Sequence, residues 1–190
     1  MRGVFHGMLQ TKRLILRSPT LNDADRIEEL ASDYDIAKTT LNIPHPYPKG
    51  SAVEFINHVL DKEKEGTIKI YAVIKKELDA LIGLINININ PAHEHGELGY
   101  WIGKPYWGNG YGTEAARAVV DFGFTHLNLH KIFARASAQN PGSWRIMEKL
   151  GMIYEGEQRQ HYIRFGKYID IVCYGILKTE YEMRKIEDTF

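Results

Sequence analysis

The chain has 190 residues, of which 44% are hydrophobic and 25% are charged, a composition typical of one globular domain with a sizeable core. Its 24 Lys and Arg residues balance 24 Asp and Glu residues, so the formal net charge is zero. We therefore expect no direct binding of nucleic acid, which requires a surplus of cations against the phosphates.

Signals for targeting and for disulfide formation are few. No apolar run is long enough to span a bilayer, so no membrane contact is expected. The opening residues lack the apolar stretch of a secretory signal. Cys173 is the only cysteine, which excludes an internal disulfide framework and is typical of a reducing compartment. These features favour a cytoplasmic protein.

The first half of the chain predicts a strand, then helices, then a hairpin. The apolar run at residues 14–16 indicates the first strand, which Pro19 ends. Ser51-x-x-Glu54 has the form of a capping box and predicts a helix that ends at Gly66. Apolar and polar residues then alternate over residues 68–75 and 85–90, a pattern that predicts two strands joined by a loop.

The second half predicts four more strands separated by two helices. Strands are expected at residues 97–103, 131–138, 152–158 and 168–177, and a helix is expected to start at Gly110. Asn140-Pro141 predicts the start of another helix, with Asn as the N-cap and Pro first, and Gly151 predicts its end. The order of elements indicates a mixed α/β (α+β) fold with a largely antiparallel sheet.

A glycine-rich segment lies between the strand at residues 97–103 and the helix that follows. Gly108, Gly110 and Gly112 allow a ligand to approach the backbone closely, and the free N–H groups at a helix start attract an anion. The segment contains no Gly-Lys-Ser/Thr, and its G-x-G-x-G spacing differs from the dinucleotide fingerprint. The spacing alone leaves an anion-binding turn and a turn without ligand both open.

Four motifs together resemble the GNAT acetyltransferases, and most of all the branch that acetylates the N-terminal alanine or serine of ribosomal proteins. In chain order they are Glu97-Leu-Gly-Tyr-Trp-Ile102, Trp107-Gly-Asn-Gly-Tyr-Gly-Thr-Glu-Ala115, Asn140-x-x-Ser143 and Glu148-Lys-Leu-Gly-Met152. The resemblance implies one domain over residues 9–181 whose sheet of about seven mostly antiparallel strands is splayed in the middle and flanked by helices. Residues 1–8 are then a flexible N-terminus or a non-native remnant, and residues 182–190 a C-terminal tail.

The resemblance also implies a donor site for acetyl-CoA as cosubstrate, with no metal. The loop that Trp107 begins would hold the pyrophosphate through Gly108, Asn109, Gly110, Tyr111, Gly112 and Thr113. Trp101 and Ile102 would pair their backbone with the pantetheine arm, and Asn140 would hydrogen-bond that arm from the other side. The family has Gln or Arg where Trp107 stands here, so the phosphate contacts are assigned to the backbone that follows it.

Acetyl transfer needs a neutral amine and a partner for the departing thiolate. Glu97 is a candidate base, acting directly or through water; a carboxylate that binds a cationic substrate, or a solvated strand residue, fits the sequence as well. By resemblance Ser143 would donate a proton to the thiolate or orient it, although a serine near a helix start often bonds its own backbone. Many family members have a Tyr where Met147 stands here, and a backbone N–H near Ile102 would hold the oxyanion.

Two other features favour simpler interpretations. His93 and His95 lie in a predicted loop with no cluster of further ligands, whereas zinc sites need three or four, so we expect a solvated loop. Cys173 falls in an apolar strand pattern and is expected to be a small core residue, not a nucleophile.

The leading hypothesis is an N-acetyltransferase that moves acetyl directly to a primary amine in a ternary complex. The acceptor would be a protein N-terminus, a polyamine or an aminoglycoside-like small molecule, and family members bind it between residues 33–49 and 158–167. The alternative is a non-catalytic protein that binds or senses acetyl-CoA. The oligomeric state stays open, a homodimer included.

Overall fold

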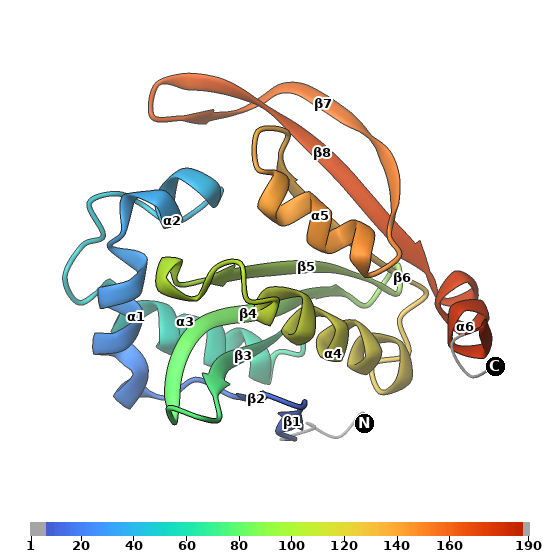
Figure 1. The fold of residues 1–190 in the computed structure, drawn as a ribbon, viewed down its shortest axis with the longest axis horizontal. Helices are drawn as coiled ribbons and strands as arrows, with labels where there is room; N and C mark the ends of the chain where they lie inside the picture. Colours follow the sequence, from blue (N-terminus) through green and yellow to red (C-terminus); the bar gives the residue numbers. More distant parts are fainter. Residues whose placement is uncertain (1–6, 188–190) are drawn as a thin grey trace.

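A computed structural model describes residues 7–187 as one sheet between two layers of helices (Figure 1). The strands are β1 (Leu9–Gln10), β2 (Leu14–Arg17), β3 (Ile68–Lys75), β4 (Ala80–Asn90), β5 (His95–Ile102), β6 (Lys131–Ser137), β7 (Ile153–Arg164) and β8 (Lys167–Leu177). The α-helices are α1 (Ala24–Ala31), α2 (Tyr34–Thr39), α3 (Ser51–Lys64), α4 (Tyr111–Thr125), α5 (Pro141–Lys149) and α6 (Lys178–Glu187), with short 3-10 helices η1 (Leu21–Asp23) and η2 (Lys104–Tyr106). Residues 1–6 and 188–190, from the predicted N-terminal segment and tail, lie outside the described residues.

The strand order is β1-β2-β3-β4-β5-β6-β8-β7, and every neighbouring pair is antiparallel except β5 with β6. The predicted mixed, mostly antiparallel sheet is therefore confirmed. The eighth strand is β1, whose two residues pair with β2 and are too short to give a period-two signal. No helix within residues 7–187 is long and apolar enough to cross a membrane.

The alternation of side chains along the strands gives the sheet two apolar faces. Ile85 and Ile87 of β4 point to α4, where they pack with buried residues such as Val119. Leu84, on the other face of β4, packs with Ile56 of α3 and with residues of α1. The sheet is thus covered by α4 and α5 on one side and by α1 and α3 on the other.

Local signals predicted one helix start correctly and another incorrectly. Asn140 is the N-cap of α5, and its side chain accepts a hydrogen bond from the backbone N–H of Ser143 at 3.2 Å. The capping box proposed for α3 is wrong, because the N-cap is Gly50 with a left-handed φ of 84° and no side chain caps this helix. Ser51 is already inside α3.

The sheet separates between β5 and β6. These strands pair in parallel only at His95↔Lys131, Gly96↔Ile132 and Glu97↔Phe133. Beyond the last pair each strand keeps only its antiparallel neighbour, so residues 98–102 of β5 and 134–137 of β6 face a gap. We call this gap the splay, and the predicted parting of the parallel strands is confirmed.

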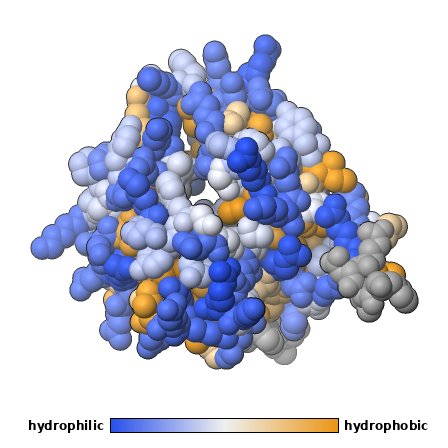
Figure 2. Space-filling view, in the orientation of Figure 1, coloured by the Kyte–Doolittle hydropathy of each residue, from blue (hydrophilic) through white to orange (hydrophobic). Residues whose placement is uncertain are grey.

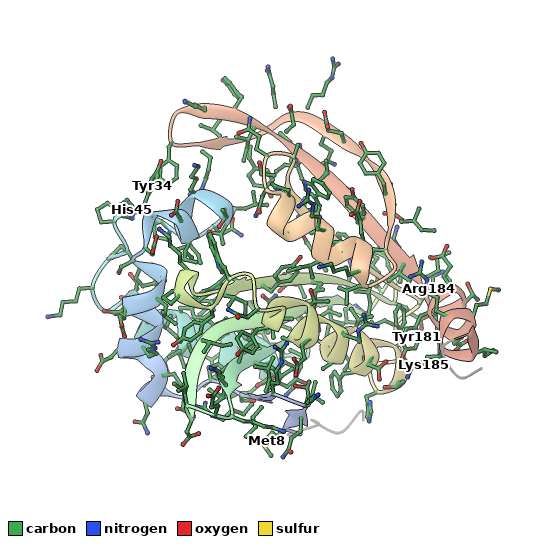
Figure 3. All side chains as sticks on the ribbon, in the orientation of Figure 1. Met8, Tyr34, His45, Tyr181, Arg184 and Lys185 are labelled. Atoms are coloured by element: carbon green, nitrogen blue, oxygen red, sulfur yellow. The ribbon has the colours of Figure 1, made fainter. Side chains whose placement is uncertain are left out.

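Helix α6 packs against the end of α4 and includes residues that the sequence analysis placed in the tail. The ring of Tyr181 stacks on Phe124 with centroids 4.7 Å apart, and its hydroxyl donates to the carboxylate of Asp121. Lys185 pairs with the same carboxylate at 3.1 Å, and Figure 3 shows Tyr181 and Lys185 together at this end of the molecule. Tyr181, which lies outside the four family motifs, thus attaches α6 to α4.

We predict that Gly83→Ala destabilises the fold, because a Cβ at this position would lie 2.2 Å from the backbone oxygen of Trp101. Overpacking of this kind lowers the free energy of unfolding by about 1–3 kcal/mol, and a backbone atom can move away less easily than a side chain. The control is Gly99→Ala, whose Cβ would lie 2.9 Å from the movable side chain of Asn86. Urea unfolding should give a clearly lower midpoint for Gly83→Ala than for Gly99→Ala, and equal midpoints would contradict the prediction.

Candidate active site

The splay is lined by backbone N–H and C=O groups that form no hydrogen bond with a neighbouring strand. The N–H of Gly103 bonds to Ile82 of β4 at 2.8 Å, which fixes the alternation of hydrogen bonds along β5. Trp101 therefore bonds to β4, whereas the N–H and C=O groups of Tyr100 and Ile102 point into the splay. An extended ligand with amide groups can pair with such an open edge.

The glycine segment forms the turn between η2 and α4, as predicted. Gly108 and Gly110 have φ values of 77° and 78°, the left-handed region that glycine occupies without strain. Gly110 is the N-cap of α4, and within the described residues the backbone N–H groups from Gly108 to Thr113 have no hydrogen-bond acceptor. These donors and the positive end of the helix dipole make an anion site.

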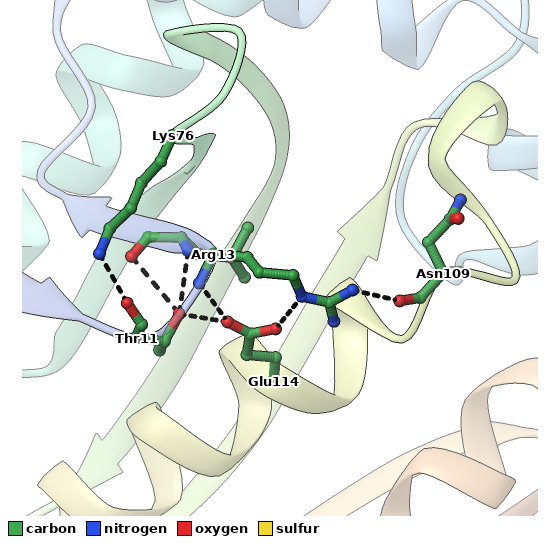
Figure 4. Close-up of polar contacts among 6 residues, drawn as sticks. Thr11, Arg13, Lys76, Asn109 and Glu114 are labelled. Atoms are coloured by element: carbon green, nitrogen blue, oxygen red, sulfur yellow. Dashed lines mark hydrogen bonds and ion pairs between the residues drawn. The ribbon is translucent and has the colours of Figure 1, made fainter.

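A polar network, drawn in Figure 4, holds this turn from the side of β2. The guanidinium of Arg13 donates to the carboxylate of Glu114 at 2.6 Å and to the backbone oxygen of Asn109 at 2.9 Å. Glu114 also accepts from the Thr11 hydroxyl at 2.6 Å, and Lys76 donates to the Thr11 carbonyl. Burial raises the pKa of Glu114, but the hydrogen bonds from Thr11 and Arg13 outweigh it and lower the pKa below its usual value.

A groove of about 580 Å³ runs from the turn along the outer side of α4. Its lining includes Gly110, Thr113, the cations Arg117 and Lys149, and the carboxylates of Glu114 and Asp121. Glu114 is paired with Arg13 and Asp121 with Lys185, whereas Arg117 donates to the backbone oxygen of Lys149 at 3.2 Å. Next to free backbone N–H groups, two cations favour a ligand that carries several phosphates.

Trp107, which stands where the family has a polar residue, is tied to the strand before it. Its indole N–H donates to the backbone oxygen of Ile102, one of the groups that face the splay. The side chain stays partly exposed at 42%. Trp107 therefore holds the turn against β5. The C=O of Ile102 is taken up by this bond, whereas its N–H stays available to a ligand.

The start of α5 closes the other wall of the splay. Asn140 caps this helix through its oxygen and donates through its amide nitrogen to the backbone oxygen of Thr39 in α2 at 3.0 Å. The hydroxyls of Ser143 and Tyr100 are 3.1 Å apart, and Tyr100 also donates to the Ser143 carbonyl at 2.9 Å. The start of α5 is thus held to β5 through Tyr100 and to α2 through Asn140.

Tyr100 was missed by sequence analysis, although its position gave a signal. It alternates with Trp101 and faces α5, as Leu98 and Ile102 do. Burial raises the pKa of Tyr100 to about 12, partly offset by the hydrogen bond with Ser143. At neutral pH its hydroxyl is therefore protonated and acts as a donor, whereas Met147, at the position of the usual family Tyr, is buried in the core.

Glu97 lies at the point where β5 and β6 separate, in the last parallel pair. Its two carboxylate oxygens accept from the guanidinium of Arg135 at 2.8 Å and 3.1 Å. Each side chain of the pair is 28% exposed, so both are partly open to solvent and not in the core. Arg135 was not predicted, because its partner is 38 residues away in the chain.

Figure 2 shows that the molecule is hollowed near its centre, in the region that α2, α5 and β5 occupy in Figure 1. The open edge of β5, which lines the splay, lies in the same region. Within residues 7–187 no three His, Cys, Asp or Glu side chains gather closely enough to hold a metal ion, and the rings of His93 and His95 stack on each other. Cys173 is half-buried and not a core residue, because its neighbours Val172 and Tyr174 take the core-facing positions.

The sequence profile of the family described as "Acetyltransferase (GNAT) domain" matches residues 13–153. An uncharacterized N-acetyltransferase of Bacillus licheniformis, p20, is 34% identical over 174 residues, which are 91% of this chain and 97% of p20. An acetyltransferase structure from Bacillus anthracis has a TM-score of 0.81 at 27% identity and covers 92% of this chain and 100% of that one. The structure of the Vibrio cholerae spermidine N-acetyltransferase with CoA and spermine has a TM-score of 0.78 at 25% identity and covers 90% and 99%. The chain therefore belongs to the GNAT family, as the motifs predicted, and is an acetyl-CoA-dependent N-acetyltransferase.

Proposed function

We propose that the protein transfers acetyl directly from acetyl-CoA to a primary amine, with donor and acceptor bound together at the splay. The observation that carries the proposal is the convergence of two routes on this gap. The turn with the free N–H groups follows β5, whose open edge lines the splay, and the hollow in Figure 2 lies in the region that β5, α2 and α5 occupy in Figure 1.

The donor fits the groups that line the first route. The free N–H groups from Gly108 to Thr113 would bind the pyrophosphate, and Arg117 and Lys149 would bind the remaining phosphate. The pantetheine arm would pair with the open edge of β5, where the direction of the backbone favours Tyr100 and Ile102 over Trp101. Asn140 would contact the arm from α5 while it caps that helix.

The chemistry begins with the amine, which must lose a proton before its lone pair can attack. Glu97 would take this proton, directly or through water, while Arg135 holds the carboxylate in one orientation. The new bond joins the amine nitrogen to the acetyl carbon, and the bond from that carbon to sulfur breaks. The Tyr100 hydroxyl, which donates its one proton to the Ser143 carbonyl in the structure, would turn that proton to the departing thiolate while the Ser143 hydroxyl holds its oxygen. The Ile102 N–H would stabilise the charge on the acetyl oxygen.

The acceptor is proposed to be a protein N-terminus or a small amine such as a polyamine. The Vibrio cholerae relative is a spermidine acetyltransferase and shares the fold over 90% of this chain. The motifs resemble most closely the branch that acetylates protein N-termini. Both acceptors present an unhindered primary amine on an extended chain, which suits a site that opens at the bottom of a hollow.

The first experiment is release of CoA from acetyl-CoA with a panel of amines that includes spermidine, N-terminal peptides and kanamycin. We expect turnover with at least one of them, and CoA binding that Gly110→Glu weakens at least tenfold, because the new carboxylate repels the pyrophosphate at the N-cap. Tight CoA binding with no turnover on any amine would show a non-catalytic binder. Unchanged CoA affinity in Gly110→Glu would place the cofactor elsewhere.

We predict that Glu97→Gln lowers turnover at neutral pH and recovers part of it at high pH, where the amine is already neutral. Gln keeps the size of the side chain and one acceptor for Arg135, so the change tests the proton acceptor. The matched control is Glu155→Gln, which removes a carboxylate that pairs with Lys131 at 2.6 Å in the same sheet. A pH profile of Glu97→Gln that coincides with the control would dismiss Glu97 as the base.

We also predict that Tyr100→Phe lowers kcat by about tenfold to a hundredfold, the range for loss of one hydrogen bond to a charged group. The ring remains, so CoA affinity should stay within twofold of wild type. Ser143→Ala should have a smaller effect in the same direction, because it removes the Ser143 hydroxyl beside the Tyr100 oxygen but leaves the Ser143 carbonyl that also bonds it. Tyr154→Phe, which removes an exposed phenol, is the control, and an unchanged kcat in Tyr100→Phe would exclude its role.

A further inference from the structure

The tip of the β7–β8 hairpin reaches across the molecule to α2. In Figure 1 the hairpin arches over α5 toward that helix. Arg164, the last residue of β7, donates to the backbone oxygens of Ala37 at 2.7 Å and Thr40 at 3.1 Å, and also to that of Ile43. These residues lie 121 to 127 positions earlier in the chain, so one guanidinium joins two distant segments.

The bonds of Arg164 satisfy carbonyls that α2 leaves open at its end. The last C=O groups of a helix have no partner inside it, and the planar fork of an arginine supplies several donors at once. The carbonyl of Thr39, between those that Arg164 binds, accepts from Asn140 at 3.0 Å. The end of α2 is therefore fixed from two sides, by the hairpin tip and by the cap of α5.

An aromatic cluster accompanies the polar contact. The guanidinium of Arg164 lies 4.7 Å from the centre of the Phe165 ring, and Phe165 lies 5.5 Å from Tyr34 of α2. Tyr34 in turn meets His45 at 5.1 Å, and Figure 3 shows these two side chains side by side. Tyr34 and Phe165 remain 48% and 45% exposed, so the cluster adds little burial and the guanidinium carries most of the contact.

The hairpin tip has little else to fix its place. β7 is the edge strand of the sheet, and its register with β8 shifts between Gln158 and Tyr162, just before the tip. Burial lowers the pKa of Arg164, and within the described residues no carboxylate pairs with it. The contact is thus a cation held by carbonyls alone at the end of a long, bent hairpin.

We infer that Arg164 determines acceptor specificity by closing a ring of α2, the hairpin tip, α5 and β5 around the hollow. A closed ring admits an amine only end-on, at the tip of a slender unbranched chain. Linear polyamines and extended peptide N-termini fit this description, whereas an amine on a bulky ring system does not. The inference rests on the proposed function, since it assigns the acceptor to the hollow.

The test compares Arg164→Met, which keeps the stem and removes the donors, with Arg164→Lys, which keeps the charge and loses the fork. Arg184→Met is the matched control, because Arg184 is exposed on α6, at the end of the molecule away from Tyr34 in Figure 3, and has no hydrogen-bond or ion-pair partner within residues 7–187. Spermidine, an N-terminal peptide and kanamycin serve as acceptors. Binding of acetyl-CoA and amide hydrogen exchange over residues 37–45 are measured in parallel.

For Arg164→Met we expect the KM of spermidine and of the peptide to rise about tenfold, the scale of one lost charge-assisted hydrogen bond. The kcat/KM of kanamycin relative to spermidine should rise by a similar factor, with acetyl-CoA affinity within twofold of wild type. Exchange over residues 37–45 should become faster. Arg164→Lys should fall between wild type and Arg164→Met, and Arg184→Met should match wild type.

Unchanged discrimination between spermidine and kanamycin in Arg164→Met would overturn the inference. If that variant does not fold, Arg164→Lys decides by the same ratio. A wild-type protein that acetylates no amine would refute the proposed function instead. In that case only hydrogen exchange tests whether Arg164 closes the ring. Faster exchange over residues 37–45 in folded Arg164→Met supports this closure, and unchanged exchange contradicts it.

Discussion

The structure depends on a parallel strand pair that stops after three residues. β5 and β6 are hydrogen-bonded only from His95↔Lys131 to Glu97↔Phe133, although both strands continue. Each keeps its antiparallel partner on the outer side, so the sheet loses hydrogen bonds only at the gap. Unpaired backbone groups there would be costly if buried and unbound, which is why the gap has to be a site for a ligand or for water.

Local signals in the sequence predicted several elements correctly. Period-two alternation identified β3 and β4, and the Asn140-Pro141 pair identified the start and the cap of α5. The glycine turn followed from the conformations that only glycine takes easily, confirmed by the left-handed φ of Gly108 and Gly110. The splay and the acetyl donor were predicted from the family motifs, because no local sequence pattern shows where two strands separate.

Contacts between distant segments could not be predicted from one sequence. Arg13 with Glu114, Glu97 with Arg135, and Arg164 with α2 join residues 38 to 127 positions apart. An arginine in a strand pattern shows only that a cation is present, and its partner depends on the sheet order. Tyr100 illustrates the same limit, because its place on β5 was visible but the approach of Ser143 was not. The unexpected residues thus all act between elements, where one sequence does not identify the partner.

Asn140 shows how the two sides of the proposed reaction can be linked through one side chain. Its oxygen caps α5 beside the splay, and its nitrogen binds the Thr39 carbonyl at the end of α2. Arg164 of the hairpin bonds to the neighbouring carbonyls of α2. The cap of α5 and the hairpin tip are therefore both attached to the end of the same short helix. A shift of α2 that admits an acceptor would therefore strain the cap of α5, and a donor that contacts Asn140 would resist that shift. Because such coupling is reciprocal, each substrate would influence the binding of the other through α2.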